Sequence, residues 1–388
     1  MSQIPRSKEN DYTIKLAQQR REWMSAKSEA PLDHVGSYSM NPAVFAGNVE
    51  QFIGVAQVPI GLAGPVIVHG EHAQGSFMIP LATTEGTLVA SYNRGMKLTR
   101  MAGGVTVHVI DDKMNRAPVF VFKDAGQARD FGKWIEVKFG IIKELAEATT
   151  SVGKLVSIEQ FSASKMRWLR FNYTCGDAAG QNMVTKATHA AVKWIMANQE
   201  WEVEYFSLAG NLDTDKKHSY INYIHTRGKR VVAEITIPDK MIREVMRTDA
   251  HTLHAQRKIS NVGALLGGSV NNGAHAANGI TAMFIATGQD VANVAESSAA
   301  LVHADVMPNG DYYFSVTIPS LIVATYGGGT GLPTQRECLA MMDCLGKGKV
   351  MKLAEIIGAV VLSGDLSLSA AIMADEWVSS HEDLGRNR

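Results

Sequence analysis

The order of apolar runs between residues 119 and 208 constrains the fold more than any other feature. The runs Val119–Phe122, KLVSIEQF, MRWLRFNY and VEYFSL are short and rich in β-branched and aromatic residues, which predicts strands. Residues 125–148 predict one or two helices, and NMVTKATHAAVKWIMANQ predicts another. The resulting order β-α-β-β-α-β is that of a ferredoxin-like unit. We therefore expect a small domain inserted into a larger one.

The flanking sequence predicts the larger domain. Residues 49–81 contain short apolar runs broken by Gly and Pro, typical of strands joined by tight turns. Residues 274–301 are apolar nearly all round, which predicts one long helix buried in a large domain. The expected fold class is α+β, with a large helix-rich domain and an inserted ferredoxin-like domain. The expected boundaries are an N-terminal helical segment 1–48, a large domain 49–121 and 209–388, and a small domain 122–208.

Composition excludes several classes of protein. Lys+Arg and Asp+Glu each total 38 in 388 residues, so no net charge attracts nucleic acid or an acidic membrane. The 3 cysteines are too few for a disulfide framework, which favours a reducing, cytoplasmic setting. The longest apolar stretch, residues 356–373, contains Gly364 and Asp365, so we expect no membrane span. His251 and His254 lack a third ligand, so we expect no metal site.

Four charged or titratable residues occupy positions that invite a chemical explanation. Glu85 lies at the expected start of a helix, as either a dipole-stabilising carboxylate or a partly desolvated proton donor. Asp290 falls midway along the expected buried helix and therefore needs a partner, for which a lysine is the obvious choice. Lys216, in a charged loop, could polarise a carbonyl or be merely solvated. His381 near the C-terminus is either a general acid or a surface histidine.

Two glycine-bearing segments are candidates for binding phosphate. Residues 176–182 precede an expected helix, whose N-terminus could face an anion, and residues 326–331 allow close backbone approach. Neither has the GxGxxG spacing of a Rossmann fold. Arg94 and Lys97 share one helix face, as a phosphate clamp or a solvated surface.

Taken together, the motifs VPIGLAGP, ATTEGTLVASYNRG, GDAAGQNM, TDKKHSYINYIHTRGK, AHAANGITA, GQD, TYGGGT and SHEDLGRNR resemble those of the HMG-CoA reductase family. The resemblance runs from about residue 48 to the C-terminus, in the soluble form of the eukaryote/archaeal class. It implies NAD(P)H-dependent, four-electron reduction of an acyl-CoA thioester, by default HMG-CoA to mevalonate in the isoprenoid precursor pathway. It also implies a homodimer, or a dimer of dimers, with active sites at the subunit interface.

The resemblance also assigns roles residue by residue. Glu85 resembles the family's carbonyl-protonating acid, Lys216 its oxyanion-stabilising lysine, Asp290 the aspartate that tunes both, and His381 the acid that protonates the departing thiolate. The implied substrate and CoA contacts are Asn93, Arg94, Lys97, Asn211, Asp215, Lys217, Arg247, Asn278 and Ser380. The implied cofactor contacts are Thr150, Ser151, Lys154, Asp177, Ala178, Gly180, Asn182, Met183, Gly327, Gly328 and Gly329. Lys154 and the hydroxyls beside it favour NADPH over NADH.

Three departures leave the acyl group open. The family holds the substrate carboxylate and hydroxyl with an arginine, a serine and a lysine, where this chain has Val121, Ala209 and Ser260; Lys258 lies two residues away. Without a bidentate cation, a carboxylate is poorly paired. A different CoA-bound or carrier-protein-bound thioester is therefore an alternative to HMG-CoA. A two-electron reductase that releases aldehyde is another.

Overall fold

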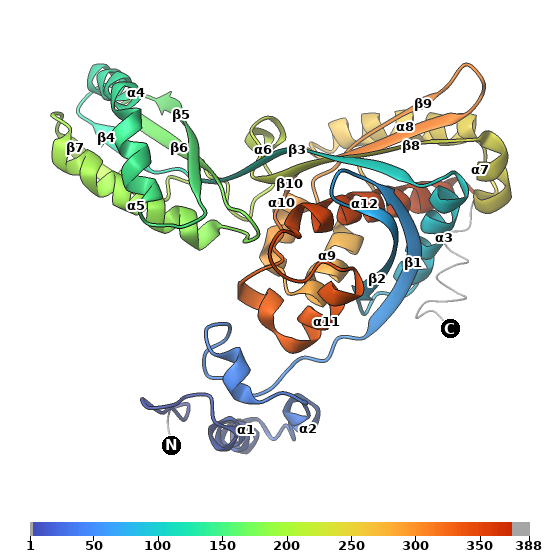
Figure 1. Cartoon of the computed structure of the whole chain (residues 1–388), viewed down its shortest axis with the longest axis horizontal. Helices are drawn as coiled ribbons and strands as arrows, with labels where there is room; N and C mark the ends of the chain where they lie inside the picture. Colours follow the sequence, from blue (N-terminus) through green and yellow to red (C-terminus); the bar gives the residue numbers. More distant parts are fainter. Residues whose placement is uncertain (1–2, 375–388) are drawn as a thin grey trace.

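A computed structural model describes residues 3–374, in which helices and strands together form an α+β fold (Figure 1). The strands are β1 (Ile60–His69), β2 (Gln74–Ala82), β3 (Val105–Arg116), β4 (Val119–Phe122), β5 (Lys154–Ala163), β6 (Met166–Thr174), β7 (Val203–Ser207), β8 (Gly228–Ile237), β9 (Leu301–Val306) and β10 (Tyr312–Leu321). The α-helices are α1 (Ile14–Ser28), α2 (Asp33–Gly36), α3 (Leu88–Met101), α4 (Ala125–Glu147), α5 (Gln181–Asn198), α6 (Tyr220–Ile224), α7 (Asp239–Met246), α8 (Ala250–Leu266), α9 (Ala276–Thr287), α10 (Val294–Ser297), α11 (Pro333–Met341) and α12 (Val350–Met373). Three 3-10 turns are η1 (Pro42–Phe45), η2 (Val291–Asn293) and η3 (Gly328–Gly331).

The strand β3 links two groups of strands. Its first part, residues 106–113, pairs with β8, and its last residues, 114–116, pair with β6. The path through the sheet is β7-β4-β6-β3-β8-β10-β9, with β5 added on β6 and the β1–β2 hairpin joined to β3. Figure 1 shows β3 running from the smaller group of strands into the larger one.

The smaller group contains the strands and helices expected from the sequence. Its antiparallel strands are ordered β7-β4-β6-β5, and α4 and α5 pack together on one face (Figure 1). The stretch 125–148, for which one or two helices are expected, forms the single helix α4. A separate hydrophobic cluster, which includes Phe120, Phe131 and Phe171, fills the space between these helices and the strands.

The larger group encloses a second, bigger hydrophobic cluster built around α12. This helix packs against α3 and against β8, β3 and β10. Among residues 3–374, α12 alone is long and apolar enough to cross a membrane, and 83% of its apolar window is buried inside the protein. Two buried carboxylates on it serve the fold: Glu355 accepts hydrogen bonds from the β1–β2 turn, and Asp365 accepts them from the Ala274 and His275 N–H groups. Such burial is the pattern of a core helix.

The prediction of one long helix over residues 274–301 is wrong. The helix α9 ends at Thr287, because Gly288 adopts a left-handed conformation with φ of 71° and terminates it. The short η2 and α10 follow, and the strand β9 begins at Leu301. Asp290 therefore lies in a turn after the helix, where its carboxylate accepts the Ala292 N–H and caps η2.

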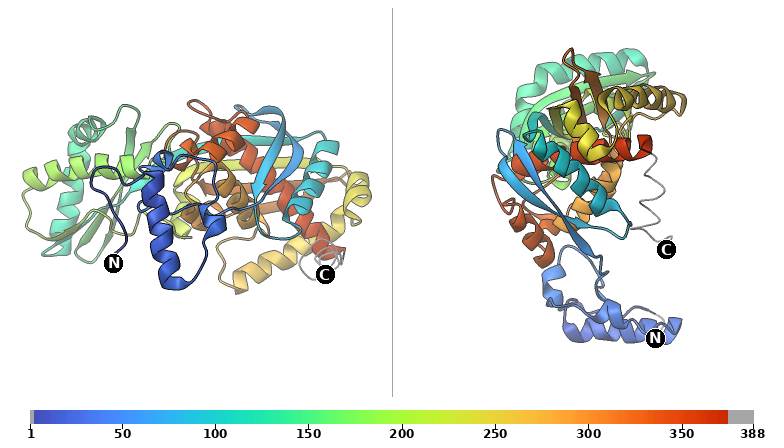
Figure 2. Two further views of the ribbon diagram at one scale, coloured as in Figure 1. Left: turned by 90° about the horizontal axis from the view of Figure 1, so that it is seen from below. Right: turned by 90° about the vertical axis from the view of Figure 1, so that its right-hand side faces the viewer.

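The expected helix start at Glu85 is also displaced. The helix α3 begins at Leu88, and residues 83–85 form an irregular segment between β2 and α3. The N-terminal segment 1–48 contains helix as expected: α1 lies within it and packs with η1 in a small hydrophobic cluster. Figure 2 shows the N-terminal segment as an arm beside the main body.

Candidate active site

The predicted pairing of Asp290 with a lysine is confirmed. The Lys216 Nζ lies 2.9 Å from the Asp290 Oδ2, with side chains that are 43% and 41% exposed. The prediction that Asp290 is buried in a helix is wrong, because the turn after Gly288 carries it to the surface. A half-exposed ammonium held by one carboxylate can still meet a substrate oxygen.

The loop between β7 and α6 presents Lys216 in an unusual backbone conformation. Thr214 and Lys216 both have positive φ, 53° and 57°, in a region that β-branched and long side chains rarely adopt. The neighbouring Asp215 accepts a hydrogen bond from the fully buried Arg227 at 2.8 Å. The Lys216 N–H donates to the buried Glu296 at 3.2 Å. The loop is therefore tied to the body of the protein by charged contacts.

Glu85 lies in a separate half of the site. The Asn278 amide donates to both Glu85 oxygens, at 2.9 and 3.1 Å. Glu85 is exposed in this chain, contrary to the expectation of partial desolvation, because the irregular segment before α3 lies at the surface. Glu85 and Asn278 line a pocket of about 370 Å³, here called the Glu85 pocket.

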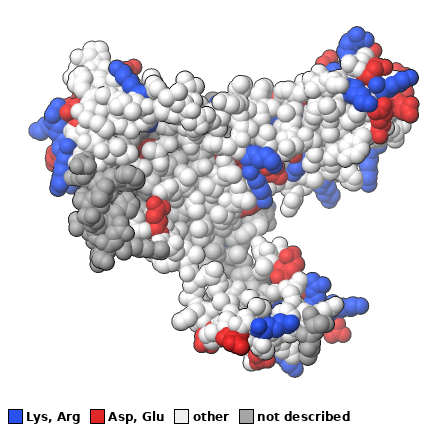
Figure 3. All heavy atoms as spheres, turned by 180° about the vertical axis from the view of Figure 1, so that it is seen from behind, with Lys and Arg blue, Asp and Glu red and all other residues white. Residues whose placement is uncertain are grey.

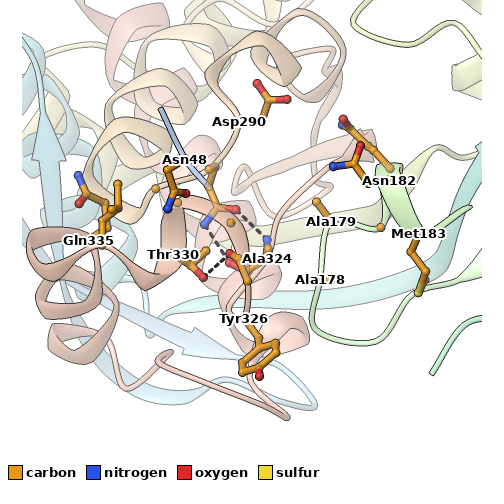
Figure 4. A pocket seen from close by; sticks show the side chains of 18 residues that line it. Asn48, Ala178, Ala179, Asn182, Met183, Asp290, Ala324, Tyr326, Thr330 and Gln335 are labelled. Atoms are coloured by element: carbon orange, nitrogen blue, oxygen red, sulfur yellow. Dashed lines mark hydrogen bonds between the residues drawn. The ribbon is translucent and has the colours of Figure 1, made fainter. Parts of the chain in front are cut away.

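The two predicted glycine-bearing segments meet across one cavity (Figure 4). This glycine-lined pocket, of about 600 Å³, is bounded by the start of α5, the turn around Asp290 and the loop before α11. Of the predicted cofactor contacts, the lining includes Ala178, Gly180, Asn182, Met183, Gly327, Gly328 and Gly329. Figure 4 shows Asp290 and Asn182 at one end of the pocket and the Tyr326 ring at the other.

Backbone crowding explains two of these glycines. A Cβ on Gly288 would lie 2.3 Å from the Gly329 carbonyl oxygen, and a Cβ on Gly329 would lie 2.6 Å from that of Gly288. By contrast, Gly327 and Gly328 have positive φ and open space around them. The buried Gln289 amide stabilises this close approach of Gly288 to Gly329, because it both donates a hydrogen bond to the Ala324 backbone and accepts one from it. The pocket wall is thus backbone that a ligand can approach closely.

The other four predicted cofactor residues, Thr150, Ser151, Lys154 and Asp177, do not line this pocket. The Asp177 carboxylate accepts the Gly348, Lys349 and Val350 N–H groups and so caps α12. The Thr150 hydroxyl donates to the Met183 sulfur at 3.1 Å, which brings it to the pocket lining. Lys154 pairs with Glu147 at 3.2 Å, and Ser151 is exposed beside them.

The predicted CoA contacts on α3 lie along one side of the helix. The Asn93 amide oxygen accepts the Gly64 N–H, while Arg94 donates to the hydroxyl and carbonyl oxygens of Ser367 on α12. Lys97 and Arg247 are exposed. Arg94 thus holds α3 against α12 in this chain.

The remaining predicted contacts divide between the loop and the C-terminus. Asn211 and Lys217 are exposed in the Lys216 loop, and the Lys217 Nζ donates to the Asp215 carbonyl at 3.0 Å. Ser380 and His381 lie outside the described residues.

The two halves of the site are connected by a groove but are not in contact. A third pocket, of about 510 Å³, shares Val58, Ala82 and Ile285 with the Glu85 pocket and Leu332 and Gln335 with the glycine-lined pocket. Asn278 lies in the first turn of α9 and Asp290 follows its end, so the helix separates them by roughly 15 Å at 1.5 Å per residue. One chain therefore does not bring Glu85 to Lys216.

Sequence reasoning missed Arg227, Glu296 and Gln289. All three are buried polar residues whose partners come from distant parts of the chain. The only signal in the sequence is a charged residue, Glu296, within the apolar run that follows Asp290. Burial raises the pKa of Glu296 to about 7, opposed chiefly by the Arg227 guanidinium.

The described residues do not include three His, Cys, Asp or Glu side chains grouped to hold a metal ion. What the site offers is a cation beside a carboxylate, at the rim of a pocket walled by glycine backbone. Such an arrangement suits an enzyme that adds charge to a carbonyl oxygen next to a bound anionic cofactor.

Comparisons with known proteins agree with this class. The family model for hydroxymethylglutaryl-coenzyme A reductase matches residues 16–386. The 3-hydroxy-3-methylglutaryl-coenzyme A reductases of Pyrococcus abyssi and Methanocaldococcus jannaschii are both 42% identical, each over 95% of this chain and 92% of the relative. The chain belongs to the HMG-CoA reductase family of oxidoreductases.

The fold is also found in solved structures. A class II 3-hydroxy-3-methylglutaryl-CoA reductase from Streptococcus pneumoniae, bound to NADPH in open conformations, matches with a TM-score of 0.69 and 19% identity. The match covers 92% of this chain and 86% of that one. A second structure of the Streptococcus pneumoniae reductase matches with a TM-score of 0.68 over 92% and 96% of the two chains.

Proposed function

We propose that this chain reduces HMG-CoA to mevalonate and free CoA with two equivalents of NADPH. Membership of the family supports the reaction, and the observation that carries it is the Lys216–Asp290 pair at the rim of the glycine-lined pocket. NADPH, when bound, supplies the hydride.

Each residue of the site has a task in that chemistry. Adding hydride to the thioester carbonyl develops an alkoxide, which the Lys216 ammonium stabilises while Asp290 holds it in place. Glu85, oriented by Asn278, protonates the oxygen of the reduced carbonyl. The departing CoA thiolate takes its proton from His381, as the family resemblance implies. CoA phosphates meet Lys97 and Arg247, which are exposed cations.

The pocket fits the cofactor. Backbone N–H groups at the start of α5 are uncapped by any side chain, because Gly180 occupies the N-cap position. Gly327 and Gly328 leave room for a pyrophosphate to approach the backbone. The Thr150, Ser151 and Lys154 side chains beyond Met183 provide polar and cationic contacts for a 2′-phosphate.

A second copy of the chain would complete the site. Glu85 with Asn278 and Lys216 with Asp290 lie at opposite ends of α9, which is the arrangement expected where each subunit supplies one half. The outer half of α8 exposes apolar side chains that a second copy can bury: Ile259 is 70% exposed, Leu265 80% and Leu266 84%. Figure 3 shows mixed charges at the extremities of one face and few at its centre. We therefore propose a homodimer, or a dimer of dimers. The low cysteine count supports the cytoplasm as its proposed location.

The smaller group of strands is the proposed cofactor domain. Its strand order β7-β4-β6-β5 with α4 and α5 on one face supports the ferredoxin-like assignment. Its hydrophobic cluster begins at Met114, so we propose a boundary near residue 114 in place of 122, with the unit ending near residue 208. The large domain then comprises the remaining residues after the N-terminal segment.

A second candidate substrate is favoured by three positions. Val121 lies in β4 between Met166 and Tyr205, Ala209 is exposed at the start of the Lys216 loop, and the Ser260 hydroxyl accepts the Gln256 amide. None of the three side chains carries a positive charge that could form an ion pair with a carboxylate. Lys258, exposed on α8, is the cation nearest in sequence to Ser260. A thioester lacking the HMG carboxylate is the alternative.

A turnover assay decides between the two. We expect NADPH oxidation with HMG-CoA at micromolar concentration, and Lys258→Ala should raise KM for HMG-CoA more than KM for NADPH. Turnover of an uncharged acyl-CoA together with inertness toward HMG-CoA would establish the alternative.

The stoichiometry tests the number of electrons transferred. Two NADPH consumed per mevalonate is the expected stoichiometry, and one NADPH with released aldehyde would refute four-electron reduction. Equal turnover with NADH would contradict the cofactor assignment.

A further inference from the structure

The loop that carries Lys216 is held in a conformation its own sequence does not favour. Three residues other than glycine have positive φ within six positions: Asn211, Thr214 and Lys216. A left-handed conformation at a Thr or a Lys persists only where surrounding contacts over-determine it. The loop therefore depends on its anchors to aim the Lys216 side chain.

One buried carboxylate provides the anchor closest to Lys216. The Glu296 Oε1 accepts the Lys216 N–H at 3.2 Å and the Arg227 guanidinium at 2.5 Å. Arg227 is fully buried and reaches Asp215, the residue before Lys216, at 2.8 Å. Glu296 thus holds the backbone of Lys216 directly and the preceding residue through Arg227.

The segment 290–296 contacts Lys216 at both its side chain and its backbone. Asp290 pairs with the Lys216 ammonium, and Glu296 accepts its backbone N–H. Asp290 and Glu296 are six residues apart, on either side of η2, and η2 packs against α9. An ammonium fixed at the side chain and at the backbone by one rigid segment has little freedom to swing away from the forming oxyanion.

We propose that Glu296, acting with Arg227, is a positioning residue that orients Lys216 for oxyanion stabilisation. The proposal rests on the reductase function proposed above. It adds the buried Arg227–Glu296 ion pair to the half-exposed Lys216–Asp290 pair as part of the active site.

The charges around Glu296 support this role. Its surroundings include Arg227, Asp215 and Lys216, with Arg116 beyond, 3.8 Å from Asp215. Burial raises the Glu296 pKa to about 7, with the Arg227 charge and the Lys216 N–H opposing that rise. Below that pH the acid becomes neutral and accepts hydrogen bonds more weakly, so the loop is held less firmly as pH falls.

The test uses two variants and a matched control in the full-length protein. We expect Glu296→Ala to lower kcat at least tenfold, while KM for NADPH changes less than twofold. Glu296→Gln keeps an acceptor without the charge, so its kcat should fall less. We expect the kcat of the parent to rise between pH 6 and 8 as Glu296 ionises, and that of Glu296→Gln to lack this rise. Asp112→Asn removes another partly buried ion pair, that of Lys229 at 3.1 Å, which joins β3 to β8. It should leave kcat unchanged.

A readout that needs no turnover separates this proposal from the proposed function. Hydrogen exchange in peptides covering residues 209–219 should speed up in Glu296→Ala and stay unchanged in Asp112→Asn. If exchange speeds up but the parent protein does not reduce HMG-CoA, the positioning of the loop stands and the reductase function fails. If the parent is active and Glu296→Ala keeps its kcat and its exchange rates, the positioning role is wrong.

Discussion

Replacing Lys216 by alanine should separate catalysis from stability. The substitution removes the cation beside Asp290 at the rim of the glycine-lined pocket. A single oxyanion donor contributes roughly 10²–10³-fold to turnover, and a charged one contributes at least as much. We therefore expect kcat to fall by at least about 10²-fold, with CoA and NADPH binding nearly intact.

The expected change in stability is small for a reason visible in the structure. The Lys216 and Asp290 side chains are 43% and 41% exposed, so solvent screens their attraction and the pair contributes about 0–1 kcal/mol. For a chain of 388 residues, that corresponds to a shift in Tm of about 1 °C. The backbone anchor at Glu296 is kept, because alanine retains the N–H.

The assay pairs NADPH oxidation with thermal unfolding, and Lys165→Ala is the matched control. The Lys165–Glu204 pair is 2.6 Å apart, with side chains 42% and 41% exposed, on the smaller group of strands. Both variants should melt within about 1 °C of the parent, and only Lys216→Ala should lose turnover. Retained turnover in Lys216→Ala would refute the assignment of the oxyanion cation. A loss of stability of several kcal/mol would refute the claim that the pair is screened.

Three further perturbations test other parts of the structure. Asp177→Ala removes the cap of α12, so chemical denaturation should show a loss of about 1–2 kcal/mol in the free energy of unfolding. Gly288→Ala places a Cβ 2.3 Å from the Gly329 carbonyl, so fluorescence titration should show NADPH binding weakened at least tenfold, whereas unaltered affinity would contradict the crowding argument. Burial lowers the pKa of His275 to about 4 from an ordinary value of 6.5. The unfolded chain therefore binds more protons between these values, and this histidine removes stability as pH falls from 6.5 toward 4; His275→Gln should lose stability less steeply over that range when unfolding is measured at each pH.

Local patterns determined most of the elements near the site. Short runs rich in β-branched and aromatic residues predicted β4 to β7, and the longer stretches between them predicted α4 and α5, because these patterns depend on neighbours within a few residues. The same reasoning failed at Gly288. The run 274–301 is apolar enough for one helix, but the left-handed Gly288 and its close approach to Gly329 end α9 at Thr287. That approach depends on Gly329, which lies 41 positions further along the chain, and it leaves no local periodicity.

The Lys216–Asp290 pair on which the function depends shows both kinds of information. The sequence by itself predicted a lysine partner for Asp290, from the cost of burying a carboxylate among apolar residues; the pair exists, although the burial does not. Only the tertiary structure decided that the pair is half-exposed and that Glu85 lies at the other end of α9. It also decided that the buried Glu296 accepts hydrogen bonds from both the Lys216 N–H and Arg227. Burial and contacts between distant segments arise from packing the whole chain, and such packing is not written in the spacing of neighbouring residues.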